Sequence, residues 1–222
     1  MTFWKENRVT LILMTITGIL LAATGIYTGQ AFFRMLPLFN SLFIALLQSR
    51  ANRIAPLLGG LNCFIYGAVY LHYTLYGSAL YVLLVAGPVQ ILTFFRWRKR
   101  PYAHSTVLKR MQTKTRLISG AAALLAYGVF FLLLRHFGSA YLLLDNTLTI
   151  IGVFISFLTM FAYVEYTFLN VISTFLNIIL YIKMLGAYPE QITFLIFYLY
   201  SFFCAVRAFF FVGRLYRLQN KA

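Results

Sequence analysis

The feature that most constrains this chain is a succession of long, continuously apolar stretches separated by short connections. Each stretch runs for about 20 residues, the length that an α-helix needs to cross the hydrocarbon core of a bilayer. A strand of a membrane barrel would instead alternate apolar and polar residues over about ten positions. The sequence therefore predicts an all-α integral membrane protein of about eight transmembrane helices, at residues 9–28, 31–49, 56–73, 76–96, 117–136, 146–164, 167–185 and 190–212.

The composition excludes a soluble globular domain. Of the 222 residues, 62% are hydrophobic and 10% are charged, whereas soluble domains are about 45 to 50% apolar and about 25% charged. So few charged residues cannot form the polar shell that a soluble core of this size requires. We therefore expect residues 1–222 to form a single polytopic membrane domain whose solvent is the lipid bilayer.

Membrane topology, rather than nucleic-acid binding, explains the excess of basic residues. The chain has 19 Lys and Arg against four acidic residues, a net charge of +15. The basic residues gather at both termini and in alternate connections, above all in the loop 97–116, as in the cytoplasmic loops of bacterial inner-membrane proteins. We expect a multi-pass protein of the bacterial cytoplasmic membrane with both termini in the cytoplasm and no nucleic-acid partner. Two alternatives stay open: the first stretch could lie on the membrane surface, and the basic loop could bind anionic lipid headgroups specifically.

A short internal repeat divides the chain into halves. The pattern L-N-x-x-x-Y occurs at Asn62 and again at Asn177. Each occurrence lies in the middle stretch of a three-stretch group, residues 31–97 and 146–212, and one further stretch at 117–136 separates the groups. An odd number of helices per group and one linking helix give the two groups the same orientation. Transporters built from such parallel repeats bind substrate between the repeats near the middle of the membrane.

Amide and aromatic side chains within the stretches are the candidate substrate-binding residues. An amide in the bilayer core must find a hydrogen-bond partner, so Asn62 and Asn177 either bind a ligand or link neighbouring helices. Gln90 lies two residues after Pro88, which indicates a broken helix that lines a cavity. Tyr66 and Tyr200 belong to aromatic runs that suit stacking against a flat heterocycle.

The sequence gives no indication of catalysis. It contains no phosphate-binding loop of the ATPase type, no H-E-x-x-H pair and no G-x-S-x-G elbow, so we expect neither an enzyme nor a cofactor or metal site. No Asp or Glu lies at the centre of a predicted helix, which leaves little material for proton coupling. Asp145, followed by Asn146 and Thr147, is expected to cap the N-terminus of its helix, and Trp97 to anchor the chain at the membrane interface.

Residues 58–97 carry motifs similar to those of the nicotinamide riboside transporter (PnuC) family. Gly60, Leu61 and Asn62 match the residue types of the family's Gly-Leu-x-Asn without the intervening position. The family's Leu-Tyr-x-Ser falls on Leu75, Tyr76 and Ser78, and its Gln or Asn seven residues before a terminal Trp falls on Gln90, before Trp97. In the second half, Asp145 and Glu165 are similar to an Asp that opens one span and a Glu that closes it. The resemblance covers about residues 36–214.

The resemblance implies an architecture and an activity. The fold would be a core of two parallel three-helix repeats joined by a linker helix, as in SWEET sugar porters, with an extra N-terminal helix at 9–28. Family members form trimers and move vitamins or their precursors by facilitated diffusion, and phosphorylation in the cytoplasm traps the substrate. The resemblance thus implies a homotrimeric uniporter that imports nicotinamide riboside. The alternatives are the transport of thiamine or another vitamin or nucleoside, and a non-transporting membrane subunit that binds substrate.

The chain departs from the family pattern in the binding motif. Phe94 and its neighbours replace the family's aromatic and glycine cluster before the terminal Trp. The repeat places the Asn of the family's W-x-x-x-N motif on Asn177, with Ser173 at the Trp position, whereas counting from Glu165 points to Asn170 and Thr174. We therefore expect the substrate-binding residues to come from one set: Asn62, Tyr66, Gln90, Phe94, Asn170, Ser173, Asn177 and Tyr200.

Overall fold

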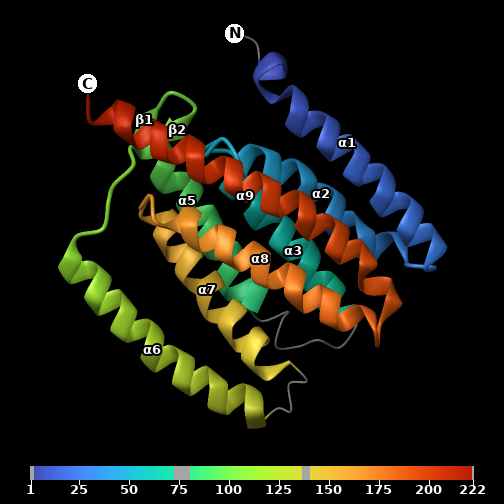
Figure 1. Cartoon of the computed structure of the whole chain (residues 1–222). Coiled ribbons are helices and arrows are strands. Elements are labelled where there is room, and N and C mark those ends of the chain that lie inside the picture. The colour runs from blue at the N-terminus through green and yellow to red at the C-terminus, as the bar shows by residue number, and fades with distance from the viewer. Residues whose placement is uncertain (1–2, 73–80, 137–140, 222) are drawn as a thin grey trace.

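The structure of the chain, a computed structural model, describes residues 3–72, 81–136 and 141–221 and is helical apart from one short hairpin (Figure 1). This confirms the all-α prediction. The motif residues Leu75, Tyr76 and Ser78 lie outside the described residues. In order, the elements are α1 (Phe3–Tyr27), α2 (Phe32–Gln48), α3 (Ala55–His72), η1 (Tyr81–Ala86), α5 (Gly87–Lys99), β1 (Pro101–Tyr102), β2 (Ser105–Thr106), α6 (Thr113–His136), α7 (Leu142–Met160), α8 (Tyr166–Leu185), η2 (Pro189–Gln191) and α9 (Ile192–Gln219).

The helices follow the predicted apolar stretches in order but differ in length. Among the described residues, five segments are long and apolar enough to cross a membrane: α1 from Asn7 onward, α6, α7, α8, and η2 together with α9. The 17 residues of α2 give about 25 Å of helix, which is less than the ~30 Å of a hydrocarbon core. A total of eight spanning helices therefore stays a prediction.

The outer surface is apolar, as lipid solvation requires. On α6, which has no buried residue, Leu117, Leu124 and Leu125 are 70–76% exposed. In water an apolar face of this extent would drive association, whereas in a bilayer it is the favoured surface. The exposure pattern thus agrees with the composition in making lipid the solvent of this chain.

Six helices pack into a closed ring. Helix α2 packs on α3, α3 on α5, α5 on α7, α7 on α8, α8 on α9, and α9 returns to α2. Helix α1 lies outside the ring against α9 and α2, and α6 lies outside it against α7 (Figure 1). The ring thus combines the two predicted three-helix groups, and their relation as parallel repeats stays a prediction.

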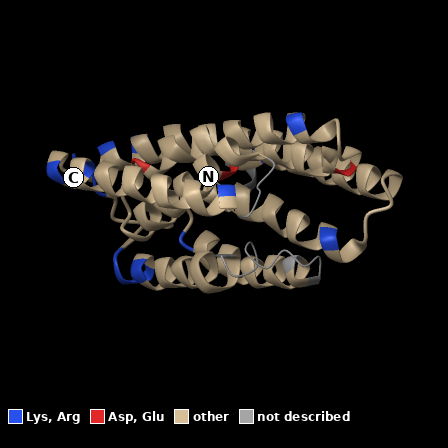
Figure 2. Cartoon of the chain, turned by 90° about the horizontal axis from the view of Figure 1, so that it is seen from below, with Lys and Arg blue, Asp and Glu red and all other residues tan. Residues whose placement is uncertain are grey.

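One end of the bundle carries most of the basic charge. The N-terminal end of α1, the C-terminal end of α9 and the hairpin β1–β2 lie toward the same end (Figure 1). Most Lys and Arg residues gather at the end that carries the C-terminus (Figure 2). This arrangement agrees with the charge pattern from which the orientation was predicted.

The basic loop between α5 and α6 folds onto the bundle instead of extending into solvent. Its Leu108 and Met111 are buried in a core cluster with Ala162 and Val212. The Lys109 amide donates a hydrogen bond to the Ala162 carbonyl (2.8 Å), and the Val164 amide donates one to the Lys109 carbonyl (2.9 Å). The loop is therefore fixed to the turn between α7 and α8.

Two local predictions need correction. Asp145 is not the N-cap of α7, because the helix begins at Leu142 and Asp145 lies within its first turn, where its charge still complements the positive end of the helix dipole. The break at Pro88 takes the form of a π-helix, η1, that ends one residue before Gly87 and Pro88 open α5. Proline is tolerated in the first turn of a helix because it removes no internal hydrogen bond there.

Helices α3 and α5 approach closely at a glycine. A Cβ atom added to Gly60 would lie 2.8 Å from Cγ1 of Ile91 and 3.1 Å from the carbonyl oxygen of Gly87. Because a backbone atom forms part of this contact, the clash cannot be relieved by a change of side-chain rotamer alone.

We therefore expect Gly60→Val to destabilise the protein by about 1–3 kcal/mol through overpacking. The measurement is the thermal unfolding midpoint of the purified protein. The matched control is Gly120→Val on α6, where an added Cβ meets nothing within 4 Å, and it should change stability by less than about 0.5 kcal/mol. Equal destabilisation by the two variants would contradict the packing argument.

Candidate functional site

A cavity of about 120 Å³ lies within the helix ring, toward its basic end. Its walls come from α2, α3, α5, α7, α8, α9 and the connection between α2 and α3. The lining residues are amides, hydroxyls, two aromatic rings and small apolar groups: Gln48, Ala51, Asn52, Ala55, Pro56, Gln90, Thr93, Trp97, Ile155, Ser156, Thr159, Tyr166, Asn170 and Ala208. No charged residue belongs to this lining.

Gln90 reaches the cavity because its neighbour on α3 has no side chain. A Cβ atom on Gly59 would lie 1.9 Å from Oε1 of Gln90, so only glycine accommodates the amide in this position. Nε2 of Gln90 lies 3.5 Å from Sγ of Cys63, and a thiol sulfur is a weak acceptor. The amide therefore keeps most of its hydrogen-bonding capacity for a ligand.

Tyr166 and Asn170 face the cavity from α8. They are four residues apart, so they lie on one face of the helix. Tyr166 is buried and lines the cavity together with Gln90, Thr93 and Trp97 of α5. Within the described part of the chain, no hydrogen bond reaches the side-chain amide of Asn170. Of the two alignments of the second-half motif, the one counted from Glu165 points to Asn170 and Thr174, and of these two residues Asn170 lines the cavity.

Trp97 is part of this cavity wall and not an anchor in the lipid interface. Its side chain is only 3% exposed, and its Nε1 donates a hydrogen bond to the carbonyl oxygen of Thr159 (2.8 Å). This bond joins α5 to α7, which belong to different halves of the chain. The position of Trp97 at the end of an apolar stretch suggested the interface because sequence alone does not show which way a helix faces.

Asn62 is the centre of a hydrogen-bond network between α2 and α3. Its Nδ2 donates to the Pro37 carbonyl (3.0 Å) and to Oγ of Ser41 (2.9 Å), and its Oδ1 accepts from Nδ2 of Asn40 (3.2 Å). Oγ of Ser41 also lies 3.4 Å from the hydroxyl of Tyr66. Asn62 and Tyr66 do not line the described cavity. They would have to exchange these bonds to contact a ligand.

The remaining predicted residues lie away from the cavity. Nδ2 of Asn177 donates to the carbonyl of Ser173 in its own helix (2.8 Å), and the Tyr200 hydroxyl donates to the Leu42 carbonyl (3.2 Å). Phe94 is half-buried against Phe95, with ring centroids 5.4 Å apart. The structure thus brings together Gln90 and Asn170 from the predicted set.

Sequence reasoning missed several polar residues that the structure places in contacts within the bundle. Gln48 and Asn52 line the cavity, and their position at the end of an apolar stretch gave no indication of this. Arg207, a charged residue inside the last apolar stretch, donates hydrogen bonds to Oγ1 of Thr10 and to Oδ1 of Asn7. A charge within a spanning helix is rare and usually marks an important contact, so its presence in the stretch 190–212 could have indicated this link to α1.

Truncation of Asn62 and truncation of Asn170 should affect stability differently in the absence of ligand. Asn62→Ala leaves the buried groups of Pro37 and Ser41 with fewer partners, so we expect it to destabilise the protein by about 1–3 kcal/mol. Asn170→Ala removes no hydrogen bond within the described residues and should leave the unfolding midpoint close to that of the parent. A stable Asn62→Ala variant would mean that the network is not structural.

Comparison with known proteins identifies the family. A profile of the nicotinamide mononucleotide transporter family matches residues 31–212. No curated protein matches the chain. A crystal structure of the vitamin B3 transporter PnuC matches with a TM-score of 0.80, covering 99% of this chain and 94% of that chain at 20% sequence identity, so the two share a fold. The profile spans most of the chain and confirms the expectation of a transporter and not an enzyme: the chain belongs to the nicotinamide mononucleotide transporter (PnuC) family of membrane transporters.

Proposed function

We propose that this transporter imports nicotinamide riboside across the bacterial cytoplasmic membrane by facilitated diffusion, and that phosphorylation in the cytoplasm traps the substrate. The observation that carries the proposal is the cavity, which combines side-chain amides with aromatic rings at the centre of the helix ring. The amides of Gln90 and Asn170 can each donate to and accept from a carboxamide. The rings of Trp97 and Tyr166 suit a flat cationic pyridinium, because aromatic faces attract cations.

The uncharged lining favours the riboside over the mononucleotide. A phosphate group brought into this cavity would lose its hydration without meeting a Lys or Arg side chain among the lining residues, and an unpaired buried charge is costly. The same argument explains how phosphorylation inside the cell would prevent the product from returning through the transporter.

The absence of acidic residues from the cavity lining supports a uniporter. Asp145 and Glu190 lie in the first turns at helix N-termini, and Glu165 forms an ion pair with Arg116 at the basic end. None of the three lines the cavity. Proton-coupled transporters place such groups along the substrate path, so we propose transport without a coupled ion.

The organisation of the whole protein belongs to the same proposal. We propose two parallel three-helix repeats, 31–97 and 146–212, joined by the linker helix α6, with α1 as an extra helix and with both termini in the cytoplasm. Two observations support this orientation: the N-terminal end of α1 and the C-terminal end of α9 lie toward the same end of the bundle (Figure 1), and most basic residues gather at the end that carries the C-terminus (Figure 2). The homotrimer stays a prediction from the family resemblance. Asn62, Tyr66, Phe94, Ser173, Asn177 and Tyr200 stay predicted contacts for other steps of the transport cycle.

Transport by the protein alone tests the mechanism. Liposomes that contain only this protein, without any ion gradient, should equilibrate labelled nicotinamide riboside across the membrane, and nicotinamide mononucleotide should not compete because of its phosphate. Thiamine, riboflavin and common nucleosides form the comparison panel. Uptake of thiamine in place of the riboside would favour the alternative that the protein transports thiamine or another vitamin. Binding without uptake would favour the non-transporting subunit.

A pair of variants tests which asparagine serves the substrate. Asn170→Ala should weaken riboside binding about tenfold to a hundredfold, since a hydrogen bond to a ligand amide is worth about 1–3 kcal/mol. Asn177→Ala is the matched control, because its amide bonds within α8. Affinity is measured from the ligand-dependent rise of the unfolding midpoint. If Asn177→Ala weakened riboside binding and Asn170→Ala did not, Asn177 would be the substrate-binding residue. That result would support the alignment based on the internal repeat.

A further inference from the structure

A groove of about 680 Å³ lies on the outside of the ring at the basic end, between α8, α9 and the start of α6. It is separate from the central cavity and shares none of its lining residues. Three arginines, Arg110, Arg116 and Arg217, line it together with the rings of Phe168, Phe209 and Phe210. The groove thus has a positively charged part and an apolar part.

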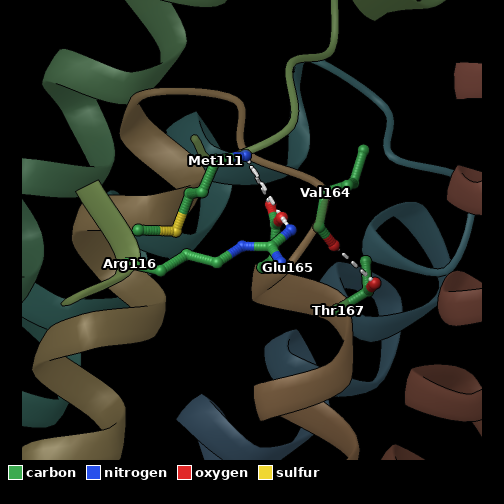
Figure 3. Close-up of polar contacts among 5 residues, drawn as sticks. All are labelled: Met111, Arg116, Val164, Glu165 and Thr167. Atoms are coloured by element: carbon green, nitrogen blue, oxygen red, sulfur yellow. Dashed lines mark hydrogen bonds and ion pairs between the residues drawn. The ribbon is translucent and has the colours of Figure 1, made fainter. Parts of the chain in front are cut away.

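The Glu165 carboxylate in the groove contacts Arg116 and also the loop that carries Arg110. Oε1 of Glu165 accepts a hydrogen bond from Nη2 of Arg116 at 2.7 Å, and the Glu165 carboxylate also accepts one from the Met111 amide at 3.1 Å (Figure 3). The Glu165 charge is therefore compensated by Arg116. Arg110 and Arg217, both exposed, leave the groove with an excess of positive charge.

The aromatic part of the groove extends from the arginines toward the middle of the membrane. Seven residues separate Phe210 from Arg217 on α9, which corresponds to about 10 Å along the helix axis. The rings of Phe168 and Phe209 have centroids 6.4 Å apart and so bridge α8 and α9. Phe168 and Phe210 are 56% and 69% exposed. The phenylalanines lie at the depth of acyl chains when the arginines lie at the depth of headgroups.

We propose that this groove binds an anionic phospholipid, with its phosphate on Arg110 and Arg217 and an acyl chain along Phe168, Phe209 and Phe210. The charge of the groove complements an anionic headgroup, and basic residues near the surface attract such lipids. A second copy of the chain would offer a poor match, because the entire sequence contains only four acidic residues. The bound lipid would hold the basic loop, α8 and α9 together.

A lipid titration of the purified full-length protein in detergent tests the proposal. Phosphatidylglycerol should raise the unfolding midpoint saturably, and phosphatidylcholine with the same acyl chains should raise it much less. The double variant R110Q/R217Q should bind phosphatidylglycerol at least about tenfold more weakly, as expected for the loss of two surface cations. The matched control R98Q/R214Q removes the same charge from exposed positions outside the groove and should keep the parent affinity. If the double variant does not fold, the single variants R110Q and R217Q replace it. Each of them should bind phosphatidylglycerol more weakly than the parent protein.

Four results would overturn the proposal. Equal weakening by both double variants would mean attraction to the surface charge in general. An equal response to phosphatidylcholine would remove the role of headgroup charge. The same stabilisation by soluble glycerol 1-phosphate would indicate a site for free phosphate esters. Dissociation of an oligomer in the R110Q/R217Q variant alone, measured by native mass spectrometry, would assign the groove to contact between copies of the chain.

Discussion

A lipid bilayer offers no hydrogen-bonding partners, and this constraint governs how the few polar side chains of this protein are used. Several of them join helices. Asn62 links α3 to α2, Arg207 links α9 to α1, and Nδ2 of Asn146 donates to the Tyr127 carbonyl to link α7 to α6. Hydrophobic burial cannot hold α1 and α6 in place, because lipid tails are as apolar as their side chains, so these polar links define where the outer helices attach.

Two amides that do not take part in such links line the candidate site. Gln90 has only a weak sulfur partner, and Asn170 has no side-chain partner among the described residues. Both line the cavity inside the ring. The amides of Gln90 and Asn170, which line the cavity, thus differ in their partners from the other two predicted amides: Asn62 joins α3 to α2, and Asn177 bonds within α8.

The sequence alone was enough to predict features that depend only on which residues a single segment contains. The length of the apolar stretches predicted the helices, and the clustering of Lys and Arg predicted which ends lie together. It was not sufficient for features that depend on how a helix is rotated in the bundle. Trp97 illustrates this limit, since its place at the end of a stretch is the same whether its ring faces lipid or the cavity. The spacing of Tyr166 and Asn170 could have been noticed, but only the packing of α8 shows that their shared face is the inner one.

The cavity lies toward the basic end of the molecule, where the two halves of the chain are in contact. The bond from Trp97 to Thr159 joins the two halves of the chain beside the cavity, and the basic loop is fixed nearby to the turn between α7 and α8. A movement that opened the cavity toward this end would separate α5 from α7 and break the Trp97 bond. The loop would then move with the half of the molecule that contains Glu165.

The uncharged lining of the cavity has an electrical consequence. A neutral site adds no charge of its own to the moving complex, so the import of a pyridinium cation carries one net charge inward. A membrane potential of 100 mV, negative inside, contributes about 2.3 kcal/mol per elementary charge. Such a potential by itself supports an internal concentration of the free cation almost fiftyfold above the external one, since each 1.4 kcal/mol is a factor of ten. A carrier with no coupled ion would thus still concentrate its substrate, with the resting voltage of the cell as the source of energy.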